Sequence, residues 1–337
     1  MENKESLAYF ALNKAQEEKA YNFNKITKEA FPRVVPNLED EHYYTSLFNT
    51  TRFLIAREFD FKKSLTMWEN WCKWRVSYRP HETKFEEIAN ELETCKSFHL
   101  GEDKNHNAVI ILLMSRNDPN VSDEETLRFG CWAVETATAL SEQVYGGKKI
   151  TFIVDKRNFS KKQMGKGGNK LMKDAAKILQ DYYPERLEKF YLIGADWYFR
   201  ILFGIVRPFL SEKTRNKLNL IDDTSHLFKH ISADNLMKEY GGNIDFKYDK
   251  YEVFNRLELL KKEKAKQANP NTTETKPMSM VQVTKEEQII FSEQKTQFSS
   301  SNTYENDDLE LGMVSEESSQ VSVSLSSYTS KYKFCKF

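Results

Sequence analysis

The amino-acid sequence predicts an α/β protein with a helical N-terminal subdomain, a largely parallel β-sheet and a long C-terminal tail. Short apolar runs at residues 109–114, 150–155 and 190–193 have the length of buried strands. Segments with helical periodicity separate these runs, and strands that alternate with helices are typical of a parallel sheet. Residues 268–337 are rich in Ser, Thr, Asn, Gln and Glu, a composition that predicts disorder.

The segment before the sheet is expected to be helical. Residues 8–19 look helical and charged, and residues 31–36, which contain two prolines, are expected to break that helix. Apolar residues at helical spacing continue between residues 43 and 60. Asp60 is a plausible N-cap for the next helix, residues 61–78, whose tryptophans are interpreted as core residues. A further helix of mixed charge is expected at residues 81–93.

The sheet region follows at Cys95. Carboxylates after Ser122 favour the start of a helix that continues to about Val144, and residues 172–180 predict a second helix. After the strand at 190–193, a short strand is expected at residues 218–221. A basic, exposed helix at residues 251–267 is expected to end the ordered part.

Residues 198–210 are apolar at nearly every position, with interruptions at Arg200 and Arg207. A helix of this kind is buried or lies against lipid, and about a dozen residues are too few to span a bilayer. It is either an ordinary core helix or a movable helix that covers an apolar cavity. Gly204 and Pro208 weaken it as a rigid rod and favour the second interpretation.

Composition and charge argue against several classes of function. Lys and Arg total 50, as do Asp and Glu, so a dedicated nucleic-acid binder is not expected. The four cysteines form no CxxC pair and predict reduced thiols rather than zinc ligands or disulfides. No signal-peptide core and no membrane-spanning apolar run is visible, which favours a cytoplasmic location.

Sequence motifs of catalysis are also missing. The sequence has no phosphate loop, no GxSxG and no HExxH. His226 and His230 lie four apart but have no evident third metal ligand. The carboxylates form no recognisable catalytic pair. The pattern therefore favours a binding protein that is not an enzyme and needs no metal or cofactor.

Four sequence pieces in register resemble the CRAL-TRIO family of lipid-binding proteins, over about residues 48–242. Residues 52–75 look like its RFLRARKFD motif and a helix ending in KWR. The strand ITFIVD looks like its strand ending in Asp. Residues 182–221 are similar to its YPERL, KxYxIN and PFL elements, and LMKEYGG to its closing LPxEYGG. The resemblance implies a mixed, largely parallel sheet with flanking helices enclosing an apolar lipid pocket, closed by a gate helix at residues 198–210.

The resemblance also implies a head-group site. Arg57, Thr214 and Lys217 match residues that contact an inositol phosphate, and two cations with a hydroxyl suit a phosphate diester. Glu185 matches a residue that helps to organise the gate. Pocket-lining residues of the gate helix would be Phe199, Leu202, Phe203, Val206 and Phe209.

The sequence departs from the family pattern at four positions. Glu58 replaces a lysine beside Arg57. Ile150 and Phe152 replace hydroxyl residues of phosphatidylcholine transfer proteins, and Ile110 replaces a tyrosine. Choline-lipid binding is therefore not expected, and any second ligand would be more apolar.

The sequence thus predicts a monomeric protein that binds phosphatidylinositol or a phosphoinositide and transfers it during transient contact with membranes. The alternatives are a lipid-sensing regulatory module, whose tail contacts protein partners, and a carrier of a sterol, tocopherol-like or prenyl lipid. The expected division is an extension (1–45), a helical subdomain (46–94), the lipid-binding domain (95–242), a C-terminal helix (243–267) and the tail (268–337).

Overall fold

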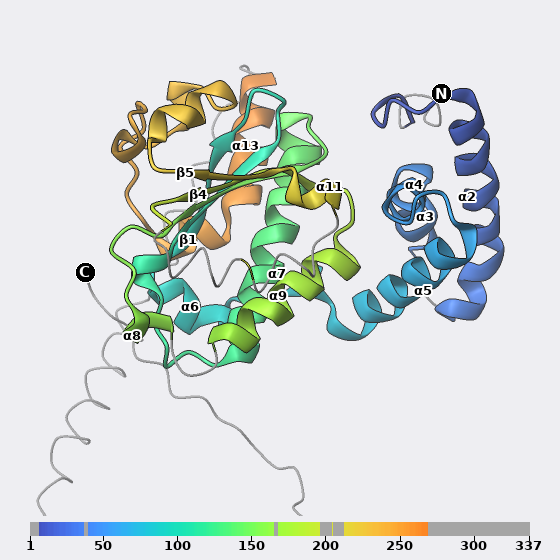
Figure 1. The fold of residues 1–337 in the computed structure, drawn as a ribbon, viewed down its shortest axis with the longest axis horizontal. Coiled ribbons are helices and arrows are strands. Elements are labelled where there is room, and N and C mark those ends of the chain that lie inside the picture. Colours follow the sequence, from blue (N-terminus) through green and yellow to red (C-terminus); the bar gives the residue numbers. More distant parts are fainter. Residues whose placement is uncertain (1–6, 37–39, 165–167, 196–203, 205–211, 269–337) are drawn as a thin grey trace, which may run out of the picture. The chain divides into compact units, whose positions relative to one another are not determined.

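The computed structural model of the chain describes residues 7–36, 40–164, 168–195, 204 and 212–268 (Figure 1). Two predictions lie outside these residues: the gate helix, apart from Gly204, and the tail beyond Ala268. The description therefore concerns the unit formed by residues up to Ala268. Helices precede a five-stranded mixed sheet with flanking helices, which confirms the predicted fold class.

The N-terminal helices are α2 (Lys14–Val34), α3 (Glu41–Thr45), α4 (Leu47–Ala56) and α5 (Phe61–Tyr78). Helix α2 begins with a capping box, in which Asn13 Oδ1 accepts from Gln16 N at 2.9 Å. The expected break at residues 31–36 comes later than predicted, because the helix includes Pro32 in its last turn and ends at Val34. Pro32 has no backbone N–H, so it removes one helical hydrogen bond, but only in the last turn of α2.

Helix α5 forms the centre of the first core. Asp60 caps it as expected, accepting from Lys63 N at 3.0 Å. Trp68 and Trp71 are fully buried against α2, α3 and α4, and Trp68 Nε1 donates to Tyr44 O at 3.0 Å. Trp68 and Trp71 therefore act as core residues, as the sequence indicated, whereas Trp74 is half-buried and packs against the same core.

The connection to the sheet is less regular than predicted. The helix expected at residues 81–93 is divided into the 3₁₀ turns η1 (Pro80–Glu82) and η2 (Phe85–Ile88) and the short helix α6 (Ala89–Glu93). Arg79, which precedes η1, has φ 51°, a left-handed conformation that ends α5.

The sheet has the order β1 (Ser97–Glu102), β2 (Ala108–Leu113), β3 (Ile150–Asp155), β4 (Leu187–Ile193) and β5 (Leu218–Ile221). Strand β1, which was not predicted, pairs antiparallel with β2, and the remaining neighbours are parallel. The β1–β2 turn is held by Asp103, whose carboxylate accepts from Asn107 N at 2.9 Å and from Thr151 Oγ1 at 2.7 Å.

Helices complete the domain around this sheet. Helix α7 (Asp123–Ala139) continues into one π-helical segment, η4 (Leu140–Tyr145), and leads from β2 to β3. The remaining helices are α8 (Lys161–Met164), α9 (Gly168–Tyr182), α11 (Glu212–Arg215), α12 (Lys250–Phe254) and α13 (Arg256–Ala268), with 3₁₀ turns η3 (Met114–Arg116), η6 (Thr224–Lys229), η7 (Ala233–Asn235) and η8 (Lys238–Tyr240).

The two faces of the sheet are buried to different degrees. One face, with Ile111, Ile153 and Tyr191, is packed beneath the segment that follows β5. On the other face, Phe152 and Phe190 are only half-buried, with ring centroids 6.1 Å apart. Leu112, Leu220 and the methionines Met114, Met164 and Met172 are also partly buried there. Because alternate residues of a strand face opposite sides, this second face is apolar along β2 to β5.

Candidate functional site

A cavity of about 430 Å³ lies where three neighbouring parallel strands begin. Lys149 immediately precedes β3, Glu185 lies two residues before β4, and Lys217 immediately precedes β5. The strand register therefore brings together side chains that lie up to 68 positions apart in sequence, counting from 149 to 217. The other lining residues are Tyr9, Phe10, Ala11, Leu12, Gln16, Ile55 and Phe59.

The two lysines of this cavity are held by oxygen atoms on β4. Lys217 Nζ donates to Leu187 O at 2.5 Å. Lys149 Nζ donates to Glu188 Oε2 at 2.8 Å. Burial alone would lower the pKa of Lys149, but the hydrogen bond to Glu188 and the nearby Tyr9 and Glu185 raise it above its ordinary value. Both side-chain nitrogens are thus held at the amino-terminal edge of the sheet.

Glu185 reaches the cavity through an unusual backbone conformation. Its φ is 57°, in the left-handed region that non-glycine residues rarely adopt. The adjoining residues anchor the turn: Pro184 O accepts from Arg52 Nη1 at 3.1 Å, and Arg186 Nη1 donates to Glu142 Oε1 at 2.6 Å and to Lys148 O at 2.8 Å. Such strain persists where surrounding contacts determine the conformation, and it is common at functional sites.

The remaining predicted site residues stand apart from this cavity or outside the described chain. Arg57 caps the end of α4, is half-buried, and donates to Ala56 O at 3.1 Å, but it does not line the cavity. Its neighbours Ile55 and Phe59 do. Thr214 lies on α11, three positions before Lys217, and its side chain is outside the described part. The five predicted gate-helix residues also lie outside the described residues: Phe199, Leu202, Phe203, Val206 and Phe209.

Sequence reasoning missed the wall formed by the N-terminal arm, defined here as residues 7–13. Tyr9 and Phe10 pack on Phe48, with centroid distances of 5.8 and 5.0 Å. Lys149 Nζ lies 5.5 Å from the Tyr9 ring and Lys148 Nζ lies 5.6 Å from the Phe48 ring, which are cation–π distances. The Tyr9–Phe10 pair was visible in the sequence, but its partners Phe48 and Lys149 lie 39 and 140 positions after Tyr9.

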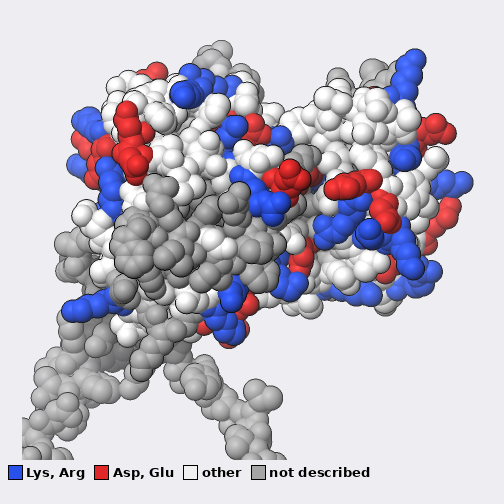
Figure 2. All heavy atoms as spheres, in the orientation of Figure 1, with Lys and Arg blue, Asp and Glu red and all other residues white. Residues whose placement is uncertain are grey.

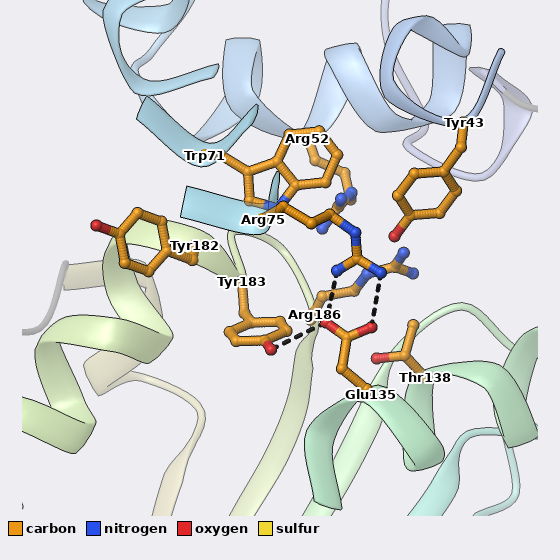
Figure 3. Close-up of a pocket in the computed structure, with 9 residues that line it drawn as sticks. All are labelled: Tyr43, Arg52, Trp71, Arg75, Glu135, Thr138, Tyr182, Tyr183 and Arg186. Carbon is orange, nitrogen blue, oxygen red and sulfur yellow. Dashed lines mark hydrogen bonds and ion pairs between the residues drawn. The ribbon is translucent and has the colours of Figure 1, made fainter. Parts of the chain in front are cut away.

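A second, much smaller cavity lies between the helical subdomain and the sheet (Figure 3). Arg75 makes a bidentate pair with Glu135, at 2.7 and 3.0 Å, and Tyr183 Oη donates to Glu135 Oε1 at 2.9 Å. Burial would raise the pKa of Glu135, but the charge of Arg75 and these hydrogen bonds hold it below its usual range. Arg52 and Arg186 also line this cavity.

The four departures from the family pattern fall at different depths. Ile110 and Ile150 are buried, at 1% and 2% exposure, in a cluster with residues of α7. Phe152 is half-buried on the apolar face, and Glu58 is exposed with φ 53°. Ile110 and Ile150 therefore place aliphatic packing at two positions where the family pattern has hydroxyl-bearing residues.

Other kinds of site find little support in the described residues. No group of three or more His, Cys, Asp and Glu side chains there is arranged to hold a metal ion. None of the helices described is both long enough and apolar enough to cross a membrane. Figure 2 shows one face of the molecule, where basic and acidic side chains of the described residues are interspersed rather than gathered by sign.

Comparison with known proteins identifies the family. Residues 92–242 match the family model described as the CRAL/TRIO domain. The chain is 30% identical over 225 residues to the SEC14 cytosolic factor of Kluyveromyces lactis, covering 61% of this chain and 74% of that protein. It is 28% identical over 246 residues to phosphatidylinositol/phosphatidylcholine transfer protein SFH9 of Arabidopsis thaliana, covering 68% and 41%. The crystal structure of Sfh5 matches with a TM-score of 0.54 at 17% identity, covering 74% and 98%.

The chain therefore belongs to the CRAL/TRIO domain family, as its motifs indicated. The likeness to Sfh5 supports the fold alone. Several curated relatives are much longer than the matching part, since the chain spans 50%, 44% and 41% of three of them.

Proposed function

We propose that this protein binds phosphatidylinositol or a phosphoinositide and carries it between membranes without making or breaking a bond. The observation that carries the proposal is that Lys217, expected at the head group, and Glu185, expected to organise the gate, both line one cavity with Lys149. A volume of about 430 Å³ lies within the usual range of small-molecule sites, roughly 300–1,000 Å³. Relatives named as phosphatidylinositol/phosphatidylcholine transfer proteins support the same class of ligand.

The chemistry of the cavity suits an inositol phosphate. Lys217 and Lys149 supply cations for a phosphate, and Glu185 supplies an acceptor for sugar hydroxyl groups. Arg57, at the end of α4, and Thr214, on α11, would supply the further phosphate contacts that the sequence motifs imply. A head group bound there would need Lys217 to exchange its contact with Leu187 O for one with phosphate.

The apolar sheet face suits the acyl chains. Phe152, Phe190 and Leu220 present half-buried apolar surface that a hydrocarbon would cover. Covering each CH₂ contributes about 0.8 kcal/mol, so the chains would hold the lipid and the polar residues would select it. Tight aliphatic packing around Ile110 and Ile150 disfavours a buried choline head group, because no hydroxyl at these positions could contact it.

The test is transfer of labelled phosphatidylinositol between vesicles by the full chain and by Lys217→Ala. A hydrogen bond to a charged group contributes about 1.5–3 kcal/mol, so binding should weaken roughly 10- to 100-fold. The melting temperature should stay within a degree or so, because a half-buried lysine seldom carries stability.

Lys262→Ala, an exposed lysine on α13, is the matched control and should transfer lipid like the wild type. Equal transfer by wild type and Lys217→Ala would contradict the phosphoinositide assignment and favour a ligand without a charged head group. Binding without movement between vesicles would instead favour a lipid-sensing module.

A further inference from the structure

The pairing of β3 with β4 is interrupted beside the cavity that we assign to the head group. Ile150 and Thr151 are consecutive on β3, but their partners on β4 are Leu187 and Lys189, so Glu188 is an extra residue in β4. One extra residue in one strand of a pair is a β-bulge, which is rare between parallel strands. Bulges are common next to functional sites, where they change the direction of a side chain.

The two residues at this bulge hold the two lysines that line the cavity. Leu187 O accepts from Lys217 Nζ, and Glu188 Oε2 accepts from Lys149 Nζ at 2.8 Å. The side chains of Lys149 and Glu188 are 23% and 20% exposed, so water screens this ion pair only in part. Glu188 is not itself among the lining residues, and it therefore acts on the cavity through Lys149.

Both members of the Lys149–Glu188 pair are charged at neutral pH. Burial would raise the pKa of Glu188, but the hydrogen bond from Lys149 and the charges of Lys149 and Lys217 hold it below its usual range. Burial would lower the pKa of Lys149, but the same hydrogen bond raises it. The charge of Lys149 is therefore matched by a carboxylate of the protein before any ligand enters.

We propose that Glu188 is a specificity-determining residue, which makes the cavity select an inositol whose only phosphate is the diester over inositols that carry further phosphates. This role rests on the proposed binding of an inositol head group. A further ring phosphate near Lys149 would also lie near the carboxylate of Glu188, and like charges brought together cost binding energy.

A ring hydroxyl group avoids this repulsion. The ammonium group of Lys149 has three N–H donors, so it can donate to a hydroxyl oxygen and keep its hydrogen bond to Glu188. The diester phosphate would bind at Lys217, which exchanges the neutral acceptor Leu187 O for it. The lysine beside β5 therefore binds the phosphate, and the Lys149–Glu188 pair tests the ring substituents.

The experiment compares two labelled lipids, phosphatidylinositol and phosphatidylinositol 4-phosphate, each presented to the full chain in phosphatidylcholine vesicles. Titration gives an affinity for each lipid, and the wild type should bind phosphatidylinositol more tightly. Glu188→Gln keeps the side-chain length and an acceptor for Lys149 but removes the negative charge. We expect the ratio of the two affinities to shift roughly 10-fold towards the 4-phosphate.

Two further variants separate the charge of Glu188 from its shape and from net charge. Glu188→Asp keeps the carboxylate on a shorter side chain and should keep most of the preference for phosphatidylinositol. Glu263→Gln, at an exposed glutamate of α13, makes the same change in net charge and should keep the wild-type ratio. An equal shift in Glu188→Asp and Glu188→Gln would assign the effect to the shape of the bulge and overturn the proposal.

Failure of this role of Glu188 can be told apart from failure of the proposed function. Wild-type binding of both lipids with equal affinity would overturn the role of Glu188 and leave head-group binding in place. A preference for phosphatidylinositol that Glu188→Gln leaves unchanged would do the same. Binding of neither lipid by the wild type would overturn the proposed function and, with it, the selection by Glu188.

Discussion

At the scale of single residues, buried polar groups report where the fold is constrained. His99 on β1 is 3% exposed and lies edge-on to Trp132, with ring centroids 5.5 Å apart. Its Nε2 lies 2.8 Å from Ala133 O. Because a carbonyl oxygen can only accept a hydrogen bond, Nε2 is the donor and carries the proton of the neutral ring. Nδ1 is buried and has no partner among the described residues, so a second proton there would be buried with no acceptor.

This residue should make stability depend on pH. Burial lowers the pKa of His99 from 6.5 to about 4, although the hydrogen bond to Ala133 opposes the shift. The unfolded chain therefore binds more protons than the folded chain between pH 6.5 and 4. Stability should be fully present above pH 6.5 and should be lost as the pH falls toward 4, by about 3 kcal/mol in all.

Urea unfolding of wild type, His99→Gln and His226→Gln at several pH values checks this expectation. His99→Gln should flatten the dependence between pH 6.5 and 4. His226→Gln, at an exposed histidine, should leave it unchanged. A wild-type slope that His99→Gln does not alter would assign the acid sensitivity to other groups.

At the scale of elements, the N-terminal arm is the part of the candidate site with the clearest separate role. It adds one wall to the cavity, and its rings stack on Phe48 beside Lys149. Leu7 anchors the start of the arm in the helical core, and Phe10 and Leu12 pack against the same core. Because the arm forms one wall of the cavity, we expect its displacement to open that cavity.

The double change Tyr9→Ala and Phe10→Ala should speed lipid release, given the proposed function. Aromatic contacts contribute about 0.5–1.5 kcal/mol each, or about 1–3 kcal/mol for the two rings, so dissociation of labelled phosphatidylinositol to acceptor vesicles should become roughly 5- to 140-fold faster. Tyr21→Ala, which removes an exposed ring of α2 outside the cavity, is the control. Release at the wild-type rate in the double variant would show that the arm is only a structural wall.

The elements also show what the sequence could and could not predict. Strands β2, β3 and β4 were predictable because apolar runs mark strands buried on both faces. Strand β1, SFHLGE, was not predictable, because Ser, His, Gly and Glu interrupt its apolar residues. The buried His99 of this strand is tolerated because Ala133 O on α7 accepts its hydrogen bond. Glu185 and Lys217 were found through motifs, whereas Lys149 and the arm required the strand register and contacts between distant segments.

At the scale of the whole molecule, residues up to Ala268 form one compact unit with its own apolar clusters. The helical subdomain and the sheet domain meet through buried groups rather than through a thin linker. Arg75 on α5 pairs with Glu135 on α7, at 6% and 15% side-chain exposure, and Trp74 stacks on Tyr182 at a centroid distance of 4.2 Å. We expect these two parts to unfold together as one cooperative unit.

Removal of residues 269–337 tests whether this unit is self-sufficient. That segment is poor in large apolar residues and rich in polar ones, so it could bury little surface to offset its chain entropy. Circular dichroism of the chain ending at Ala268 should give a single unfolding transition, with a melting temperature within about 2 °C of the full chain, a shift that corresponds to under 1 kcal/mol. Vesicle transfer of phosphatidylinositol should persist, because each residue lining the described cavity precedes position 218. A fall of 10 °C, or about 3 kcal/mol, would instead show that the C-terminal segment contributes packing to the folded unit.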